Sequence, residues 1–345
     1  MDSFLLLTRA GSEGDCAAEL AERAGRLGLP GYARAEDGQG WLRWECPGGG
    51  ASALLRPMPV FARTAWSVRA DLALPERDRV TVVLDKLDPA CRYGRLYLEY
   101  PDTNDGRGLQ RFLRGFRPAL EKALKARGQL DSRAAETLHL FFPHSRRAAL
   151  GESDSGSEAT AAWENGIPRL RLAREAPSRS ALKLEEGLLR LLAPSEREYW
   201  LRAGRSAADL GAAPGGWSWL LARKGLRVTA VDHGALDEAL LRDYPVEHVR
   251  ADAFTWRAGG GLDWVVCDVV DKPARTLSLM EIWLREGRAR LALFNLKLPM
   301  KKRWPFVSEA LERLRGALPD HSVRAAQLYH DRDEVTLAVV PEAGR

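Results

Sequence analysis

A glycine-rich loop in the second half of the chain has the residue types of a ligand-binding turn. The loop, Asp209 to Trp217 (DLGAAPGGW), follows a strand pattern and opens a helix pattern. Small residues let the backbone approach a ligand closely, and the start of a helix presents free N–H groups. The loop is not GxGxxG and no GK[ST] follows it, which excludes a Walker-type phosphate cradle.

Acidic residues end the strands that come after this loop. Asp232 follows Val231, Asp252 follows the segment 246–251, and Asp268 ends WVVCD. Open α/β sheets bind ligands beyond the carboxyl ends of their strands, where a carboxylate accepts hydrogen bonds from ribose hydroxyls. With Asp209 on the first strand, four acids in register predict a nucleotide-like cofactor. Structural coincidence is the alternative, because Asp is common in loops.

Two lysines and two carboxylates are expected to meet at the same edge. Lys297 ends the fifth strand in NLKLP, Glu334 directly precedes the last strand, and Lys183 lies in the first turn of the helix before the sheet. With Asp268 they form a candidate catalytic group. A lysine flanked by other cations loses its proton more easily and can act as a base toward an alcohol. An ordinary surface lysine is the alternative for Lys297.

Strand and helix patterns alternate from about residue 178 onward, which predicts an α/β domain with a mostly parallel, doubly wound sheet. The last two strands have only a short connection, so we expect them to pair antiparallel as a hairpin. The expected strands are 206–210, 227–231, 246–251, 262–267, 290–294, 322–328 and 335–340. The expected helices are 182–192, 216–224, 274–286 and 304–317, with Ser178 and Ser180 as N-cap candidates.

The first half of the chain has α+β patterns. We expect strands at 4–8, 40–46, 80–84 and 138–142, with 80–84 predicted from its β-branched residues. Helices are expected at 16–27 and 108–127, and the polar segment 151–166 is expected to be a loop or hairpin tip. The start of the chain has no basic region and resembles a first strand, not a signal peptide.

The predicted helix 108–127 belongs to a basic strip. Between residues 107 and 133 there are eight Lys or Arg against two acids, whereas the whole chain has a net charge of +5. Such a strip predicts a polyanion partner such as RNA, with a solvated helix face as the alternative. Arg111, Arg114 and Arg117 are the candidate RNA-binding residues.

These motifs resemble the RNA ribose 2′-O-methyltransferases of the heat-shock-induced rRNA methyltransferase type. The resemblance rests on DLGAAPGGW, VCD, NLKLP and DEVT, and on the longer stretches SRSALKLEE, LFNLKLPMKKRW and QLYHDRDEVT. It implies S-adenosylmethionine as the cofactor, a Lys-Asp-Lys-Glu tetrad, and a cytidine ribose of 23S rRNA as the substrate. Ala213 is a departure, because close members of the family have Cys there.

The resemblance assigns roles to individual residues. The tetrad maps onto Lys183, Asp268, Lys297 and Glu334, with Lys297 taking the proton of the ribose 2′-OH. The expected cofactor-binding residues are Ser180, Asp209, Gly211, Ala213, Pro214, Gly215, Gly216, Trp217, Asp232, Asp252 and Asp268. The implied organisation is a ferredoxin-like unit at 1–75, a THUMP RNA-binding domain at 76–175 and a Rossmann-like methyltransferase domain at 176–345.

Other methyl acceptors fit the motifs less well. Methylation of a base amine usually shows [DN]PP[YFW] after the fourth strand, where this chain has Asp268-Val269-Val270-Asp271. Methylation of cytosine C5 needs a nucleophilic Cys. Cys267 follows Val266 and is expected to point away from the Asp268 face into the core, because strand residues alternate.

Composition limits the remaining classes. Four cysteines without a CxxC pair indicate a reduced, cytoplasmic protein with no disulfide framework and no metal. No apolar run is long enough to span a bilayer. A monomer is favoured, although no motif encodes the oligomeric state. Two other classes stay open: an RNA-binding protein without activity, against which the intact tetrad argues, and a nicotinamide-dependent oxidoreductase, which lacks its GxGxxG.

Overall fold

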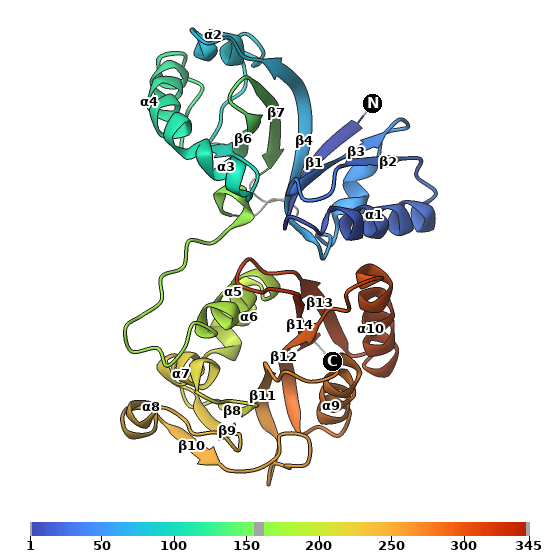
Figure 1. The fold of residues 1–345 in the computed structure, drawn as a ribbon, viewed down its shortest axis with the longest axis vertical. Coiled ribbons are helices and arrows are strands. Elements are labelled where there is room, and N and C mark those ends of the chain that lie inside the picture. Colours follow the sequence, from blue (N-terminus) through green and yellow to red (C-terminus); the bar gives the residue numbers. More distant parts are fainter. Residues whose placement is uncertain (1, 155–161, 343–345) are drawn as a thin grey trace. The chain divides into compact units, whose positions relative to one another are not determined.

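The computed structural model describes residues 2–154 and 162–342. The chain forms two compact units, residues 1–168 and 169–345 (Figure 1). No helix of the described residues is long and apolar enough to cross a membrane.

The first unit is built on one seven-stranded sheet with the order β2-β3-β1-β4-β7-β6-β5. All its pairings are antiparallel except β5 with β6. The long strand β4 pairs with β1 on one side and β7 on the other, and so joins both halves of the sheet. The strands are β1 (Asp2–Thr8), β2 (Tyr32–Ala35), β3 (Trp41–Cys46), β4 (Ala62–Ala73), β5 (Arg95–Glu99), β6 (Glu136–His144) and β7 (Arg147–Asp154).

The helices of the first unit are α1 (Glu13–Leu27), α2 (Arg79–Leu84), α3 (Asn104–Gly108) and α4 (Gln110–Ala126), with short 3-10 turns at Ala51–Leu55 and Glu164–Gly166. The expected amphipathic helix is confirmed as α4. It buries Leu113, Phe116, Leu120 and Leu124, which are three or four residues apart and therefore share one face.

The strand expected at 80–84 is wrong, because this segment is helix α2. Its apolar residues Val80, Val83 and Leu84 have the spacing of a helical face and pack in the same core cluster as the buried residues of α4. The β-branched residues lose only about 0.5 kcal/mol each in a helix, so burial outweighs their preference for a strand.

The loop expected at 151–166 is corrected at both ends that the structure describes. Residues 151–154 complete β7, and 164–166 form a 3-10 turn; residues 155–161 lie outside the described part. Position 151 in β7 requires glycine because β4 lies too close to leave room for a Cβ. A Cβ there would lie 2.1 Å from the Ser67 carbonyl oxygen and 2.4 Å from the Trp66 ring.

The second unit has the predicted α/β architecture, with the strand order β10-β9-β8-β11-β12-β14-β13. β8 to β12 pair in parallel, and β14 pairs antiparallel with both β12 and β13, as expected for a final hairpin. The strands are β8 (Ser206–Leu210), β9 (Arg227–Val231), β10 (Val246–Val249), β11 (Leu262–Cys267), β12 (Ala289–Lys297), β13 (His321–Ala326) and β14 (Glu334–Pro341). The helices are α5 (Ala181–Leu191), α6 (Pro194–Trp200), α7 (Gly216–Arg223), α8 (Glu238–Asp243), α9 (Pro273–Arg285) and α10 (Arg303–Ala317).

The strand order reverses at β8, whose neighbours are β9 and β11. Chain connections leave this point toward both sides of the sheet, which opens a crevice beyond the carboxyl ends of the strands. The predicted loop after β8 and Asp268 after β11 therefore flank the same crevice. Cys267, one residue earlier, is fully buried as expected, and burial raises the pKa of its thiol to about 12.

We predict that Gly151→Ala lowers the free energy of unfolding of the first unit by about 3 kcal/mol, because the added methyl overpacks the contact with β4. Gly115→Ala is the matched control, since a Cβ there meets nothing within 4 Å on helix α4. The control gains up to about 1 kcal/mol from helix propensity. Urea unfolding of both variants measures the difference, and equal stabilities would contradict the proposed contact.

Candidate active site

The loop after β8 has the backbone that the cofactor prediction needs. Gly211 has φ +79° and Gly215 φ +112°, a left-handed region that favours glycine. A Cβ on Gly211 would lie 3.1 Å from the Cβ of Val269, and one on Gly215 would lie 2.4 Å from Leu240. The loop is therefore packed between the segment after β11 and helix α8, and it holds the N-terminus of α7 at the crevice.

The start of α5 lies directly against this loop. A Cβ on Gly216 would stand 2.4 Å from the hydroxyls of both Ser178 and Ser180, which are 2.6 Å apart. The indole of Trp217 donates to the Ser180 carbonyl at 3.0 Å. Ser180 occupies the N-cap position of α5 without the expected side-chain capping bond. Trp217 is buried, so it supports the loop from beneath.

Asp209 lies beneath the loop, away from its surface. The carboxyl is 1% exposed and accepts from the Ser218 hydroxyl on α7 at 2.7 Å. Burial raises the pKa of Asp209 to about 7, an effect that Ser218 opposes and Asp268 reinforces. This residue links β8 to the first turn of α7 and in this way positions the loop.

Asp232 directly follows β9, as predicted, whereas Asp252 lies three residues beyond β10, because this strand ends at Val249 and not at the expected residue 251. The carboxylate of Asp232 accepts from the backbone N–H of Ala213 at 2.9 Å and of Gly234 at 2.7 Å. Asp252 is exposed and accepts from the backbone N–H of Phe254. Each carboxylate oxygen has two lone pairs, so both residues keep acceptor capacity for ribose hydroxyls or amines. The loop and its acids thus fit a nucleoside-containing cofactor.

Three tetrad residues are joined by ion pairs. The Lys183 ammonium lies 2.6 Å from Glu334 Oε2 and 3.4 Å from Asp268 Oδ1. Lys183 projects from α5, Asp268 follows β11, and Glu334 begins β14. All three side chains are about four-fifths buried, so their charges are exposed to little water. Charges in such places are stable only when they are paired.

The carboxylates keep Lys183 protonated. Burial alone would lower its pKa, but Asp268 and Glu334 together raise the pKa above the ordinary value. For Asp268, burial raises the pKa, while Lys183 and the Asn295 amide oppose that rise. Lys183 is therefore a fixed cation and hydrogen-bond donor. The lowered pKa expected for a lysine among cations does not apply to Lys183, because its neighbours are anions.

Lys297 has a different environment. It ends β12, where it pairs in register with Glu334 across the antiparallel ladder, and its side chain is exposed. Directly opposite residues on one sheet face have Cβ atoms about 5 Å apart. The structure therefore places Lys297 beside Glu334 through the backbone of the sheet, and its side chain is accessible to solvent.

Sequence reasoning missed the residues that hold Asp268. Asn295 donates from its amide to Asp268 at 2.7 Å and accepts from the Thr336 hydroxyl at 2.7 Å. Asn295 and Lys297 alternate along β12 with one residue between them, so they share a face. This pattern was a detectable signal, because the polar residue two positions before Lys297 follows a run of four hydrophobic residues at 291–294.

The loop between β13 and β14 is held by a second residue that sequence reasoning missed, Glu186. Its buried carboxylate accepts from the backbone N–H of Tyr329 at 2.8 Å and of His330 at 2.9 Å. It also contacts His330 Nδ1 at 2.7 Å. Glu186 lies one helical turn after Lys183 on α5. The same helix face therefore positions both the lysine and the loop that leads to Glu334.

The three candidate RNA-binding arginines are not equivalent. Arg111 and Arg114 are exposed on α4. Arg117 is partly buried and donates to the Leu96 carbonyl at 3.1 Å and to the Glu164 carboxylate. Arg117 therefore stabilises the first unit, and only the other two present their guanidinium groups freely to solvent.

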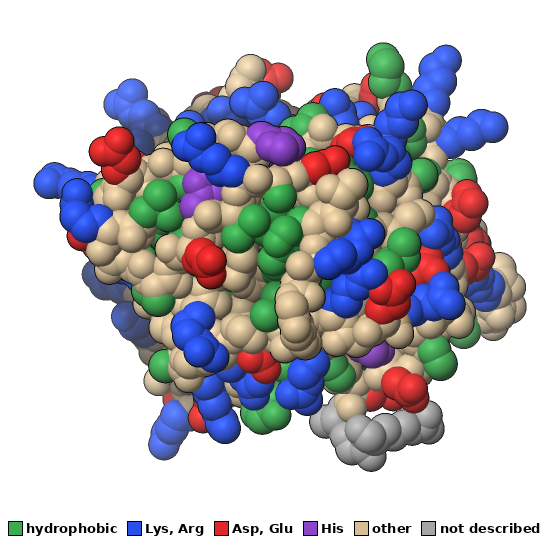
Figure 2. Space-filling model, turned by 90° about the horizontal axis from the view of Figure 1, so that it is seen from below, with side chains coloured by type: hydrophobic (Ala, Val, Ile, Leu, Met, Phe, Trp, Pro, Cys, Tyr) green, Lys and Arg blue, Asp and Glu red, His purple; other side chains and the backbone are tan. Residues whose placement is uncertain are grey.

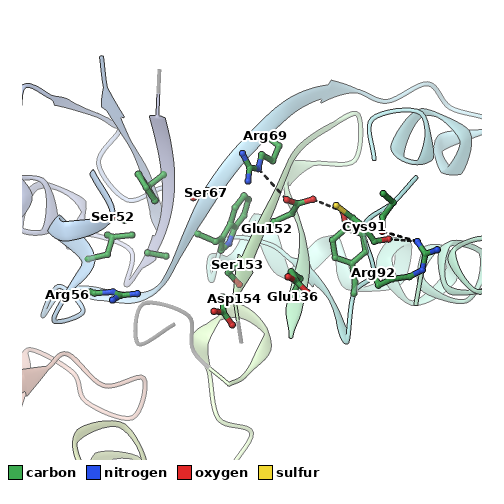
Figure 3. A pocket seen from close by; sticks show the side chains of 16 residues that line it. Ser52, Arg56, Ser67, Arg69, Cys91, Arg92, Glu136, Glu152, Ser153 and Asp154 are labelled. Carbon is green, nitrogen blue, oxygen red and sulfur yellow. Dashed lines mark hydrogen bonds and ion pairs between the residues drawn. The ribbon is translucent and has the colours of Figure 1, made fainter. Parts of the chain in front are cut away.

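The first unit also contains a cavity of about 690 Å³ beside β4 (Figure 3). Arg69 and Tyr93 both contact Glu152 in its wall, at 3.3 and 2.6 Å. Three arginines and three acids line the cavity, so its charge favours no anion. Among residues 2–154 and 162–342, no cluster of His, Cys, Asp and Glu could hold a metal ion.

We predict a pH-dependent stability from Asp209. Between its ordinary pKa of 3.8 and the folded value of about 7, the unfolded chain has lost the proton that the folded chain retains. The free energy of unfolding therefore falls as pH rises through this window and then levels off. Asp209→Asn keeps the acceptor for Ser218 but cannot ionise. Its stability relative to wild type should grow across the window, by about 1.4 kcal/mol per pH unit. Urea unfolding below and above the window measures this, and a constant difference would contradict it.

Both units of the chain are similar to known proteins. Three family models match: RlmM ferredoxin-like domain over residues 1–63, Ribosomal RNA large subunit methyltransferase M, N-terminal over 78–154, and FtsJ-like methyltransferase over 176–298. Among solved structures, TrmN from Thermus thermophilus covers 99% of this chain and 100% of its own at 17% identity, with a TM-score of 0.34.

Curated relatives match over nearly the whole chain. Ribosomal RNA large subunit methyltransferase M of Alkalilimnicola ehrlichii is 49% identical, over 99% of this chain and 95% of its own length. The protein of the same name from Azotobacter vinelandii is 46% identical, over 97% of both chains. The one from Xanthomonas campestris is 44% identical, over 98% and 99%. The resemblance found in the sequence is thus confirmed, and the chain belongs to the ribosomal RNA large subunit methyltransferase M family.

Proposed function

We propose that this chain methylates the ribose 2′-OH of a cytidine in 23S rRNA, with Lys297 as the general base. The observation that supports this best is the geometry of the tetrad. Lys183, Asp268 and Glu334 are paired by charge, and Lys297 stands beside them in the sheet with its side chain exposed. An alcohol acceptor needs a base and a cation at its oxygen, and this group supplies both.

The two lysines divide the work. Lys183 is held protonated by its carboxylates and can donate a hydrogen bond to the acceptor oxygen, but it cannot take a proton. Lys297 takes the 2′-OH proton on Nζ. Asp268 and Glu334 hold Lys183 in place, and Asn295 holds Asp268. Much of the rate comes from holding the reacting groups close and in line.

The cofactor of this family is S-adenosylmethionine, which supplies a methyl group on a positively charged sulfur. The loop from Gly211 to Gly216 with Trp217 beneath it, the hydroxyl of Ser180 and the carboxylates of Asp232, Asp252 and Asp268 would hold it. The close contact between Gly216 and the hydroxyls of Ser178 and Ser180 supports this assignment, because it brings α5 and the loop to one side of the crevice. Asp209 acts from below by positioning the loop.

The first unit is proposed to bind the RNA. The relatives are named for ribosomal RNA, and Arg111 and Arg114 present positive charge on one helix of this unit. Figure 2 shows one face of the molecule, on which basic side chains are interspersed with acids, so the proposal rests on α4 and not on that face. We propose that the chain is organised as a ferredoxin-like part at 1–75 and a THUMP part at 76–175, followed by a catalytic part at 176–345. We also propose that the protein is a cytoplasmic monomer.

Lys297→Ala should abolish methyl transfer to 23S rRNA taken from a strain that lacks the gene, because it removes the amine that is proposed to accept the proton. The wild type should yield 2′-O-methylcytidine in nucleoside analysis. Binding of S-adenosylmethionine by calorimetry should be unchanged in the variant, which separates loss of chemistry from loss of fold. Methyl label on a base, or transfer retained at the wild-type rate by the variant, would contradict the mechanism.

Arg111→Gln with Arg114→Gln should weaken RNA binding and reduce the slope of log affinity against log salt by up to about two, because two phosphate contacts are lost. Arg117→Gln is the matched control. It breaks contacts within the unit and should lower stability without the same change of slope. Filter binding over a range of salt measures both, and an unaltered slope in the double variant would remove α4 from the RNA-binding surface.

A further inference from the structure

The two most exposed large hydrophobic side chains of the described residues follow two tetrad members. Val270 is 82% exposed and Met300 is 96% exposed, whereas the next, Leu27, is 53% exposed. Val270 comes shortly after Asp268, and Met300 shortly after Lys297. Single exposed hydrophobic residues are normal, but two at the edge where a substrate must enter indicate a contact surface.

The segment that carries Val270 is fixed on both sides. Asp268 is bound by Lys183 and Asn295, and Val269 packs against Gly211 of the cofactor loop. On the other side, Arg275 of helix α9 donates to the Asp271 carboxylate at 2.5 Å. The outward direction of Val270 therefore belongs to an anchored backbone.

Met300 lies on a turn that is also anchored at both ends. The Leu298 N–H donates to the Asp333 carbonyl at 2.7 Å, and Arg303 contacts both Pro299 and Asp333. Lys302 ends the turn in the left-handed region, with φ +57°. The thioether is held out into solvent, where its removal from water by a ligand is favourable.

The surroundings of this apolar pair are basic. Lys301 and Lys302 are exposed, and the ion pairs recorded for the described residues include neither of them. The strands β11 and β12, which lead to Val270 and Met300, are hydrogen-bonded neighbours about 4.8 Å apart. Apolar contact flanked by free cations matches an unstacked nucleotide, which has an apolar base face and anionic phosphates.

We propose that Val270 and Met300 form a platform for the base of the target nucleotide, and that Lys301 and Lys302 hold its neighbouring phosphates. The inference rests on the proposed function, since the tetrad places the acceptor ribose at this edge. The ligand class is a single-stranded nucleotide withdrawn from its stack. The free cations favour this polyanion over a protein partner.

The test compares wild type with one double variant, which carries both Val270→Thr and Met300→Gln. Both substitutions keep side-chain size and remove apolar character. Ile282→Thr is the matched control, because Ile282 is an exposed hydrophobic residue (38%) on α9 of the same unit. Methyl transfer to protein-free 23S rRNA gives KM and kcat, filter binding gives the RNA Kd, and calorimetry gives the affinity for S-adenosylmethionine.

The double variant should raise KM and RNA Kd on the order of tenfold, with kcat and cofactor affinity within twofold of wild type, and the control should change neither. Unchanged KM and Kd would overturn the platform. A defect confined to ribosomal particles would also overturn it, by assigning the patch to a protein. RNA that binds wild type without being methylated would contradict the proposed function instead, and the platform would then be judged by Kd alone.

Discussion

The ion pairs of Lys183 are the constraint on which the site depends. One ammonium lies between two carboxylates that come from the two strands beside β12: Asp268 follows β11, and Glu334 begins β14. Removing one partner of a buried pair leaves an uncompensated charge, at a cost of about 3–5 kcal/mol. Helix α5, the parallel strands and the final hairpin must therefore dock together before all three charges are paired.

This constraint explains how two identical side chains can have different chemistry. Lys183 lies between two carboxylates and stays charged. Lys297 ends β12 beside Glu334, and its side chain is exposed to solvent. The residues around them maintain the difference. Asn295 orients one carboxylate, and Glu186 fixes the loop that leads to the other through three contacts. The cofactor loop is held in the same way, by the buried Asp209 below it.

Sequence alone predicted the second unit well, because parallel strands and their helices have periodic patterns and ligand-binding residues gather at one edge. The tetrad members, the loop and the antiparallel hairpin are where the motifs place them. Side-chain networks were beyond reach: nothing in the pattern pairs Glu186 with a loop far along the chain. In the first unit, the β-branched residues at 80–84 suggested a strand. The helical spacing of the apolar residues was the better predictor, because helix α2 buries them in the core. Arg117 looked like its neighbours in sequence, yet it is bound by Glu164.

The most direct test lowers the basicity of one lysine amine without removing the amine. In a Cys91→Ser background, whose other three cysteines are buried, Lys297→Cys is alkylated with bromoethylamine, which restores the lysine shape with sulfur in place of a methylene. The matched protein carries the same change at Lys183. Sulfur makes the amine a weaker base, so single-turnover methyl transfer should rise at lower pH when the change is at Lys297. The same change at Lys183 should leave unaltered the pH at which the rate of methyl transfer rises. A shift that follows Lys183 instead would contradict the assignment of the two lysines.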